Sequence, residues 1–164
     1  MRDILFTPWR MEYILSDKSG SCLFCEKVRE EKDQDNLILF RGKHSFIIMN
    51  LYPYNNGHLM IVPYKHGASL LDLGDETQIE MMKLLKISEK IIRELMSPDG
   101  FNVGINIGEA AGAGIKEHIH IHIVPRWNGD TNFFSTIGDT KAIPEALKET
   151  YRKFHTLFSE IILN

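Results

Sequence analysis

Three histidines alternate with three isoleucines in the segment HIHIHI at residues 118–123. Side chains in a β-strand alternate between its two faces, so His118, His120 and His122 are expected on one face, about 6.5–7 Å apart along the strand. The isoleucines can pack against a core, which leaves the histidine face for a cleft. Because buried imidazoles need a partner for each ring nitrogen, this pattern favours a functional site over a solvated strand face.

Two kinds of chemistry fit such a row of imidazoles. A His-x-His pair with a third ligand from elsewhere in the chain can hold zinc. Alternatively, one imidazole attacks a phosphate while its neighbours orient it, since neutral histidine is nucleophilic near pH 7. The loop GEAAGAG at residues 108–114 favours the second chemistry, because its glycines let backbone N–H groups approach an anion closely.

The two cysteines of the chain, Cys22 and Cys25, have CxxC spacing. From the spacing alone they are a redox pair, half of a metal site, or two small buried residues. A thioredoxin-like redox pair opens a helix after a strand in a βαβ unit, and the sequence predicts no such unit. We interpret His44 and His155 as a surface residue and a structural residue, with His44 a rival metal ligand.

The apolar patterns place the histidines on a sheet. Alternating or continuous apolar runs predict strands at residues 37–41, 44–51, 58–63, 101–107 and 117–124. The charged residues 26–36 (EKVREEKDQDN) are expected to form a solvated helix or loop, and residues 52–57 (YPYNNG) a turn.

Two helices complete the predicted fold. The longer one begins at Asp75, with Asp75 or Thr77 as its cap, and stops at residues 97–100 (SPDG). Its apolar positions follow helical spacing: Ile79, Met82, Leu85, Ile91, Ile92 and Leu95. They serve either the core or a surface for self-association. The second helix is predicted over residues 144–163, with Pro144 in its first turn. Strands and helices do not alternate regularly, so an α+β domain with an antiparallel sheet is expected.

Composition limits the classes of protein to consider. The chain has 164 residues, a formal net charge of −3 and a pI of about 6.2, with 43% hydrophobic and 25% charged residues. These values predict one globular domain that binds neither nucleic acid nor an acidic membrane surface. No apolar run reaches the roughly 18 residues that span a bilayer, and the first residues make a poor signal peptide. We therefore expect a cytoplasmic protein.

The histidine segment, read as HIHIHIV at residues 118–124, resembles the His-φ-His-φ-His-φ-φ signature of the histidine-triad (HIT) family, in which φ is apolar. The similarity extends upstream to Asn50 and residues 52–63, and downstream through residues 124–127 (VPRW), Asn132 and residues 137–145. Residues 8–13 (PWRMEY) are also similar to the branch that includes bacterial diadenosine tetraphosphate phosphorylases and Fhit-like dinucleoside polyphosphate hydrolases. The resemblance covers most of the chain and implies the HIT-like α+β fold.

The resemblance also implies roles for single residues. His120 would attack the α-phosphorus and form a nucleotidyl-histidine intermediate, His122 would help to hold the phosphate, and His58 would lie beside the triad. The expected nucleotide-binding residues are Asn50 at the ribose, Asn106, Gly112, Ala113 and Gly114 at the phosphates, and Trp127 beside the second nucleotide. The implied substrate is a dinucleoside polyphosphate or another AMP conjugate. Water or inorganic phosphate would be the acceptor, with phosphoramidate hydrolysis or binding without turnover as alternatives.

In several relatives a similar CxxC combines with two histidines to hold structural zinc, and the matching residues here are His66 and His118. Such a closed set of Cys22, Cys25, His66 and His118 suits structural rather than catalytic zinc, and it disfavours a zinc hydrolase built on the histidine row. The resemblance further implies a homodimer. One domain is expected over residues 1–164, with a zinc-binding segment at about 8–30, a catalytic core at about 36–128 and a C-terminal extension at about 129–164.

One departure from the pattern concerns the residues just before the triad. Some relatives carry a Ser or Thr there, whereas this chain has Ala113-Gly114-Ile115-Lys116 and no hydroxyl. The preferred acceptor is therefore left open by the sequence, with Lys116 as an alternative source of charge.

Overall fold

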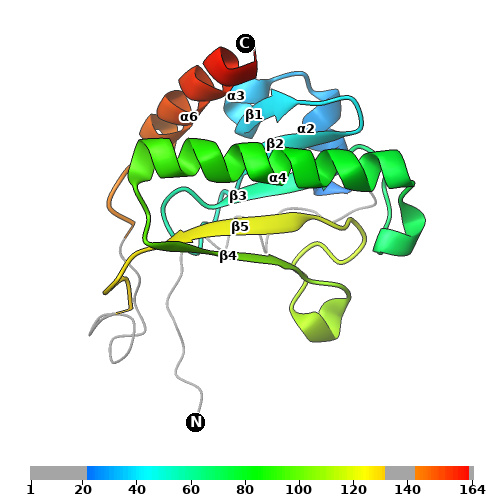
Figure 1. Ribbon diagram of the computed structural model, residues 1–164. Coiled ribbons are helices and arrows are strands. Elements are labelled where there is room, and N and C mark those ends of the chain that lie inside the picture. Colours follow the sequence, from blue (N-terminus) through cyan, green and yellow to red (C-terminus); the bar gives the residue numbers. More distant parts are fainter. Residues whose placement is uncertain (1–21, 132–142, 163–164) are drawn as a thin grey trace.

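A computed structural model describes residues 22–131 and 143–162. Within these residues the chain forms a five-stranded antiparallel sheet in the order β1-β2-β3-β5-β4 (Figure 1). The strands are β1 (Ile38–Arg41), β2 (Ser45–Met49), β3 (Leu59–Pro63), β4 (Gly100–Ile105) and β5 (Ile121–Arg126). The helices are α2 (Leu23–Arg29), α3 (Asp33–Asn36), α4 (Asp75–Met96) and α6 (Leu147–Ile162), with short 3-10 turns η1 (Leu70–Asp72) and η2 (Glu109–Ala111). The predicted α+β class is confirmed.

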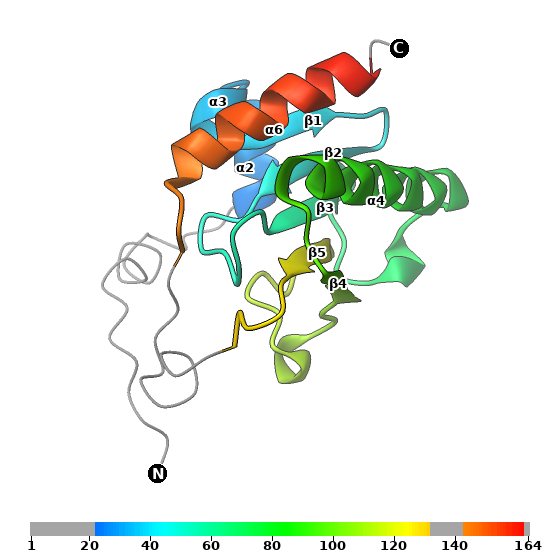
Figure 2. The same cartoon turned by 60° about the vertical axis from the view of Figure 1, so that its left-hand side comes forward.

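The sheet has helices on both of its sides. The long helix α4 packs on β2, β3 and β5, and α6 packs on β1 and α4. Figure 2 shows α2 on the side of the sheet away from α4. Ile121 and Ile123 of β5 are buried with the residues of α4 that face the sheet: Met81, Leu84, Ile91 and Ile92. The odd-numbered side chains of β5 therefore face α4, and His122 faces the α2 side.

The strand that carries the histidines is shorter at its start than predicted. We expected it over residues 117–124, but β5 begins at Ile121 and runs to Arg126. Its ladder to β3 pairs Ile121 with Ile61 and reaches no further upstream. Only His122 of the triad therefore lies in the strand. The preceding residues are still tied down, because Ile119 donates its N–H to the carbonyl of Gly67 at 2.7 Å.

The predicted start of α4 at Asp75 is confirmed, but its cap and the start of the C-terminal helix differ from the prediction. Gly74, and neither Asp75 nor Thr77, is the N-cap of α4, and its carbonyl accepts the N–H groups of Thr77 and Gln78. Asp75 lies in the first turn, where negative charge is favoured by the helix dipole. The C-terminal helix starts at Leu147 instead of residue 144, because the carbonyl of Ala146 accepts the first helical hydrogen bonds. The predicted stop of α4 is confirmed at Ser97, whose φ is +46°.

The first described residues are largely helical. The charged residues 26–36 form the second half of α2 and all of α3, in agreement with the solvated helix that was one of two alternatives. The PWRMEY segment and residues 132–142 of the family resemblance lie outside the described residues. Among the helices that are described, none combines the length and apolar character needed to cross a membrane.

Candidate active site and metal cluster

The imidazoles of His58 and His122 form the centre of the site. Nε2 of His58 lies 2.9 Å from Nδ1 of His122, because β3 and β5 are paired with Met60 opposite His122. The backbone N–H of Tyr54 donates to Nδ1 of His58 at 3.1 Å, so this nitrogen is an acceptor. His58 therefore carries its proton on Nε2 and donates it to His122. The neutral His122 then keeps its own proton on Nε2, where it can donate to a phosphate oxygen.

His120 is held in the tautomer that a nucleophile requires. Its Nδ1 lies 2.9 Å from the carbonyl oxygen of His118, which can only accept, so Nδ1 carries the proton. Nε2 of His120 consequently bears the free lone pair, and no described residue forms a hydrogen bond with it. The rings of His120 and His122 are 4.6 Å apart between centroids. A phosphate could thus meet the lone pair of one histidine and the N–H of the other.

Burial of the triad is greater than the sequence suggested. We expected the histidine face to line an open cleft, but His118 and His120 are only 1% and 4% exposed, and His122 alone is half-buried. The physical reason is Phe24 of α2, whose ring covers both His118 and His120. Sequence periodicity places side chains on a face but does not show which distant element covers it.

Burial also keeps these imidazoles neutral. Desolvation lowers the pKa of His120, against a smaller opposing effect of its hydrogen bond to the His118 carbonyl. Desolvation, helped by the nearby His120, lowers the pKa of His122 to about 4. Both rings are therefore uncharged near pH 7, the state in which His120 is nucleophilic and His122 can both accept from His58 and donate from Nε2.

The four predicted metal ligands converge on one point. The ligand atoms of Cys22, Cys25, His66 and His118 all lie within 4.8 Å of one another. Nδ1 of His118 is 3.2 Å from Sγ of Cys22 and 3.7 Å from Sγ of Cys25, and Nδ1 of His66 is 3.6 Å from Sγ of Cys25. A tetrahedral zinc ion separates its nitrogen and sulfur ligands by about 3.6 Å. The cluster can therefore hold a metal ion of this kind.

The orientation of His118 supports this use of the cluster. Its Nε2 lies 2.8 Å from the carbonyl of Pro63 and must donate to it, which leaves the lone pair of Nδ1 facing the thiols. The rival ligand His44 lies elsewhere, with Nε2 3.3 Å from the carboxylate of Glu76. The cluster and the triad thus share one residue, His118.

The predicted nucleotide-binding residues fall into two groups around the histidines. Asn50 lies beside His58, with Nδ2 3.3 Å from Nδ1 of His58, and its Oδ1 accepts the N–H of Tyr52. On the neighbouring edge strand, Gly104 pairs with His122, and nothing lies within 4 Å of the position that a Cβ there would take. Because Gly104 has no side chain there, open space adjoins the exposed side of His122. Asn106 directly follows this strand.

The loop of residues 108–114 is open and already partly hydrogen-bonded. Gly108 and Gly112 have φ values of +81° and +83°, which L side chains rarely adopt. The N–H of Gly112 donates to Glu109, and that of Ala113 to Gly108. These two donors stabilise the loop itself. Lys116, the alternative source of charge, is paired with Glu109 at 2.9 Å on the surface.

Trp127 is not brought together with the histidines. Its Nε1–H donates to the carbonyl of Met96 at the end of α4, at 3.3 Å. It therefore lies beyond the far end of β5 from His122, on the α4 side. A part in flanking the second nucleotide stays a prediction from the resemblance.

Two aromatic residues of the site were missed by the sequence analysis. Tyr54 supplies the N–H that sets the tautomer of His58, and its half-exposed ring lies 4.7 Å from the His58 ring and 5.8 Å from the His122 ring between centroids. Phe24 covers His118 and His120. The position of Phe24 inside the CxxC segment was the available signal, whereas nothing in the turn around Tyr54 indicated a backbone role.

Comparison with known proteins now identifies the family. The family model described as HIT domain matches residues 31–129. The chain belongs to the HIT family. The AP-4-A phosphorylase of Mycobacterium tuberculosis is 41% identical over 161 residues, covering 93% of this chain and 82% of that protein. With a relative this similar, the chain is placed among the enzymes of the HIT family.

Two further relatives support the assignment. The adenosine 5′-monophosphoramidase HNT1 of Saccharomyces cerevisiae is 32% identical over 107 residues, covering 65% of this HIT chain and 63% of that protein. The crystal structure of a Zn-bound histidine triad family protein from Mycobacterium smegmatis superposes with a TM-score of 0.71 at 26% identity, covering 87% of this chain and 96% of that one. The solved structure and the sequence relatives therefore indicate the same family.

Proposed function

We propose that the chain cleaves dinucleoside polyphosphates such as diadenosine tetraphosphate through a nucleotidyl intermediate on His120. Nε2 of His120 forms a bond to the α-phosphorus, and the bond from that phosphorus to the bridging oxygen breaks, so that ATP leaves. An acceptor then attacks the same phosphorus and frees the imidazole. Phosphate as acceptor yields ADP, whereas water yields AMP. We favour phosphate because the M. tuberculosis relative is named a phosphorylase.

The observation that carries this proposal is the hydrogen bond from Nδ1 of His120 to the carbonyl of His118. It puts the lone pair on Nε2 before any substrate arrives, as covalent catalysis requires. The neighbouring His122, oriented by His58, offers an N–H to a non-bridging phosphate oxygen. In the same proposal Asn50 binds ribose, and Asn106, Gly112, Ala113 and Gly114 surround the remaining phosphates.

Zinc at the Cys22, Cys25, His66 and His118 cluster belongs to this proposal as a structural ion. Two thiolates and two imidazoles complete a tetrahedral set and leave no position for a substrate. When bound, the ion would join the start of α2 to the residues that precede β5. The support is the convergence of the four ligand atoms and the Zn-bound relative from M. smegmatis.

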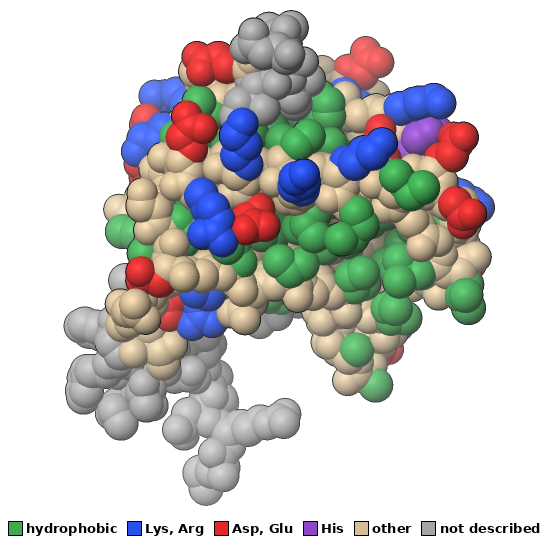
Figure 3. All heavy atoms as spheres, in the orientation of Figure 1, with side chains coloured by type: hydrophobic (Ala, Val, Ile, Leu, Met, Phe, Trp, Pro, Cys, Tyr) green, Lys and Arg blue, Asp and Glu red, His purple; other side chains and the backbone are tan. Residues whose placement is uncertain are grey.

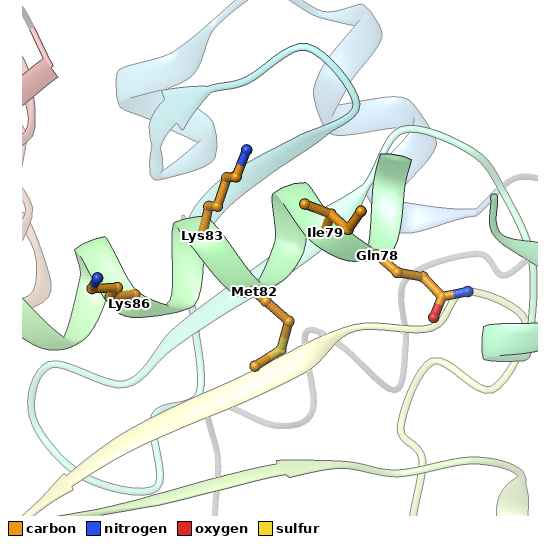
Figure 4. A pocket seen from close by; sticks show the side chains of 5 residues that line it. All are labelled: Gln78, Ile79, Met82, Lys83 and Lys86. Carbon is orange, nitrogen blue, oxygen red and sulfur yellow. The ribbon is translucent and has the colours of Figure 1, made fainter. Parts of the chain in front are cut away.

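We also propose that the chain forms a homodimer through an apolar surface on α4 and β4. Ile79 and Met82 were expected among the helix's regularly spaced apolar residues, yet they are 55% and 59% exposed, and they line a shallow hollow with Gln78, Lys83 and Lys86 (Figure 4). Val103 of the edge strand β4 is 52% exposed. Figure 3 shows hydrophobic side chains gathered beneath a row of lysines and arginines on this face. A second copy fits because it can cover the apolar side chains and pair with β4, which is an edge strand among the described residues.

The test of the reaction is product analysis with diadenosine tetraphosphate, with and without inorganic phosphate. We expect ADP plus ATP only when phosphate is present, and no product from His120→Ala, while His44→Ala, a histidine outside the site, keeps full activity. AMP plus ATP without phosphate would make the enzyme a hydrolase. Full activity of His120→Ala would refute the mechanism.

A phosphoramidase activity is the second candidate, and the 32% identity to the S. cerevisiae phosphoramidase favours it. The same His120 intermediate would form from adenosine 5′-phosphoramidate with release of ammonia, and water would then yield AMP. Comparing kcat/KM for the two substrates decides between the candidates. Cytoplasmic location and the absence of a nucleic-acid partner stay predictions from the sequence.

A further inference from the structure

Phe24 lies between the metal cluster and the proposed nucleophile. It is the residue inside the CxxC segment that points inward, and it is 1% exposed. Its ring meets His118 edge-on at 5.4 Å between centroids and 77°, and His120 at 5.1 Å and 63°. Edge-to-face contacts of this kind have a preferred geometry, so they constrain the orientation of both rings.

The cluster and the nucleophile are also joined through the backbone. Nδ1 of His118 faces the two thiols, while the carbonyl of His118 accepts the hydrogen bond from Nδ1–H of His120. A metal ion held by Cys22 and Cys25 fixes the residues on both sides of Phe24. The hydrogen bond from the His118 carbonyl and the ring contact from Phe24 therefore connect His120 to a candidate metal ligand and to the residue next to Cys25.

We propose that Phe24 is a positioning residue that makes the reactivity of His120 depend on occupancy of the Cys22, Cys25, His66 and His118 cluster. The hydrogen bond at Nδ1 and the His122 ring 4.6 Å away constrain the imidazole from two directions. They leave part of its rotation open on the Phe24 side, because the terminal torsion of histidine is broad. The Phe24 ring removes that freedom and keeps Nε2 aimed at the phosphate. With the cluster empty, Phe24 keeps its core contact with Phe46 but loses the constraint that a bound ion places on the residues at both sides of it. The inference rests on the proposed role of His120 as nucleophile.

The experiment compares Phe24→Leu with Phe154→Leu, a matched control. Phe154 is equally buried, and it lies in α6, which packs on β1 and α4 and carries no residue of the triad. Both zinc-loaded proteins would be examined for zinc content, AMP affinity, single-turnover cleavage of diadenosine tetraphosphate, and imidazole nitrogen NMR. For Phe24→Leu we expect bound zinc, AMP affinity within about twofold of wild type and a cleavage rate lowered at least about tenfold, as a small misplacement of a reacting group predicts. Phe154→Leu should keep the wild-type rate.

The NMR signal of the His120 Nδ1 proton separates this inference from the proposed reaction. We expect a slowly exchanging signal in the wild type that broadens in Phe24→Leu and in zinc-free wild type alike. A wild-type cleavage rate in Phe24→Leu, an equal loss in both leucine variants, or a change in AMP affinity alone would overturn the positioning role. If the wild type cleaves no substrate, the proposed reaction fails, and an unchanged Nδ1 signal in Phe24→Leu would then refute the positioning role independently.

Discussion

The Nε2–H group of His58 donates a hydrogen bond of 2.9 Å to Nδ1 of His122. His58 directly precedes β3, and His122 lies in the adjacent antiparallel strand β5. The backbone N–H of Tyr54 donates to Nδ1 of His58 and so fixes the tautomer of this donor. The consequence is a neutral His122 with its remaining proton on Nε2. A backbone N–H in the turn before β3 therefore decides which nitrogen of His122 carries the proton.

Replacing His58 by phenylalanine keeps a ring in place but removes the proton donated to His122. We expect kcat to fall by about 100-fold, the usual scale for a lost proton-donating arrangement, with a smaller change in KM. Steady-state kinetics with diadenosine tetraphosphate and phosphate provide the measurement, and His155→Phe, an exposed histidine of α6, is the control. An unaltered kcat in His58→Phe would show that the tautomer of His122 is set in another way.

Stability should fall as the pH drops from 6.5 toward 4. The pKa of His122 is lowered from 6.5 to about 4 in the folded protein by desolvation, so in this window the unfolded chain binds more protons than the folded one. The free energy of unfolding therefore rises with pH across the window, and acid favours unfolding. The lowered pKa of His120 acts in the same direction.

Calorimetry across this pH window tests the linkage. The melting temperature of wild type should decline more steeply with acid than that of His122→Asn, which lacks the titrating ring. Parallel declines of the two proteins would mean that His122 carries its ordinary pKa in the folded state.

Loss of one cluster ligand should abolish tight metal binding. For Cys25→Ser we expect zinc affinity to drop by more than about 100-fold, because even outer partners of a metal ligand matter by 10- to 100-fold, together with a lower melting temperature. Zinc content after dialysis and a thermal melt measure both effects. His44→Ala removes a histidine outside the cluster, and it should retain the metal. Equal zinc content in Cys25→Ser and wild type would eliminate Cys25 as a ligand.

A charge placed on the apolar surface should separate the proposed dimer. Met82→Lys puts a third lysine beside Lys83 and Lys86, so burial against a second copy becomes costly. Sedimentation equilibrium should report a monomer for this variant and a dimer for wild type and Thr156→Lys, which adds the same charge on exposed α6. A dimeric Met82→Lys protein would place the interface elsewhere.

Much of this protein is determined by local sequence. Alternation in HIHIHI correctly put Ile121 and Ile123 in the core, with His122 on the opposite face, because a period of two needs only strand geometry. The end of α4 at Ser97 was likewise predicted from the sequence, since the proline and glycine of residues 97–100 end a helix through their own backbone preferences. The four candidate metal ligands were predicted through the family resemblance, and the structure brings their ligand atoms within 4.8 Å of one another.

The tertiary structure decided what depends on contacts between distant segments. The start of β5 at Ile121 follows from where the ladder with β3 ends, and the burial of His120 follows from the ring of Phe24. The exposure of Met82 on α4 follows from which flank of the helix meets the sheet. The tautomers of the histidines depend on the Tyr54 N–H and on two carbonyl groups, those of Pro63 and His118. Hydrogen bonds to backbone atoms are indifferent to the side chain of the residue that supplies them, so no sequence pattern records them.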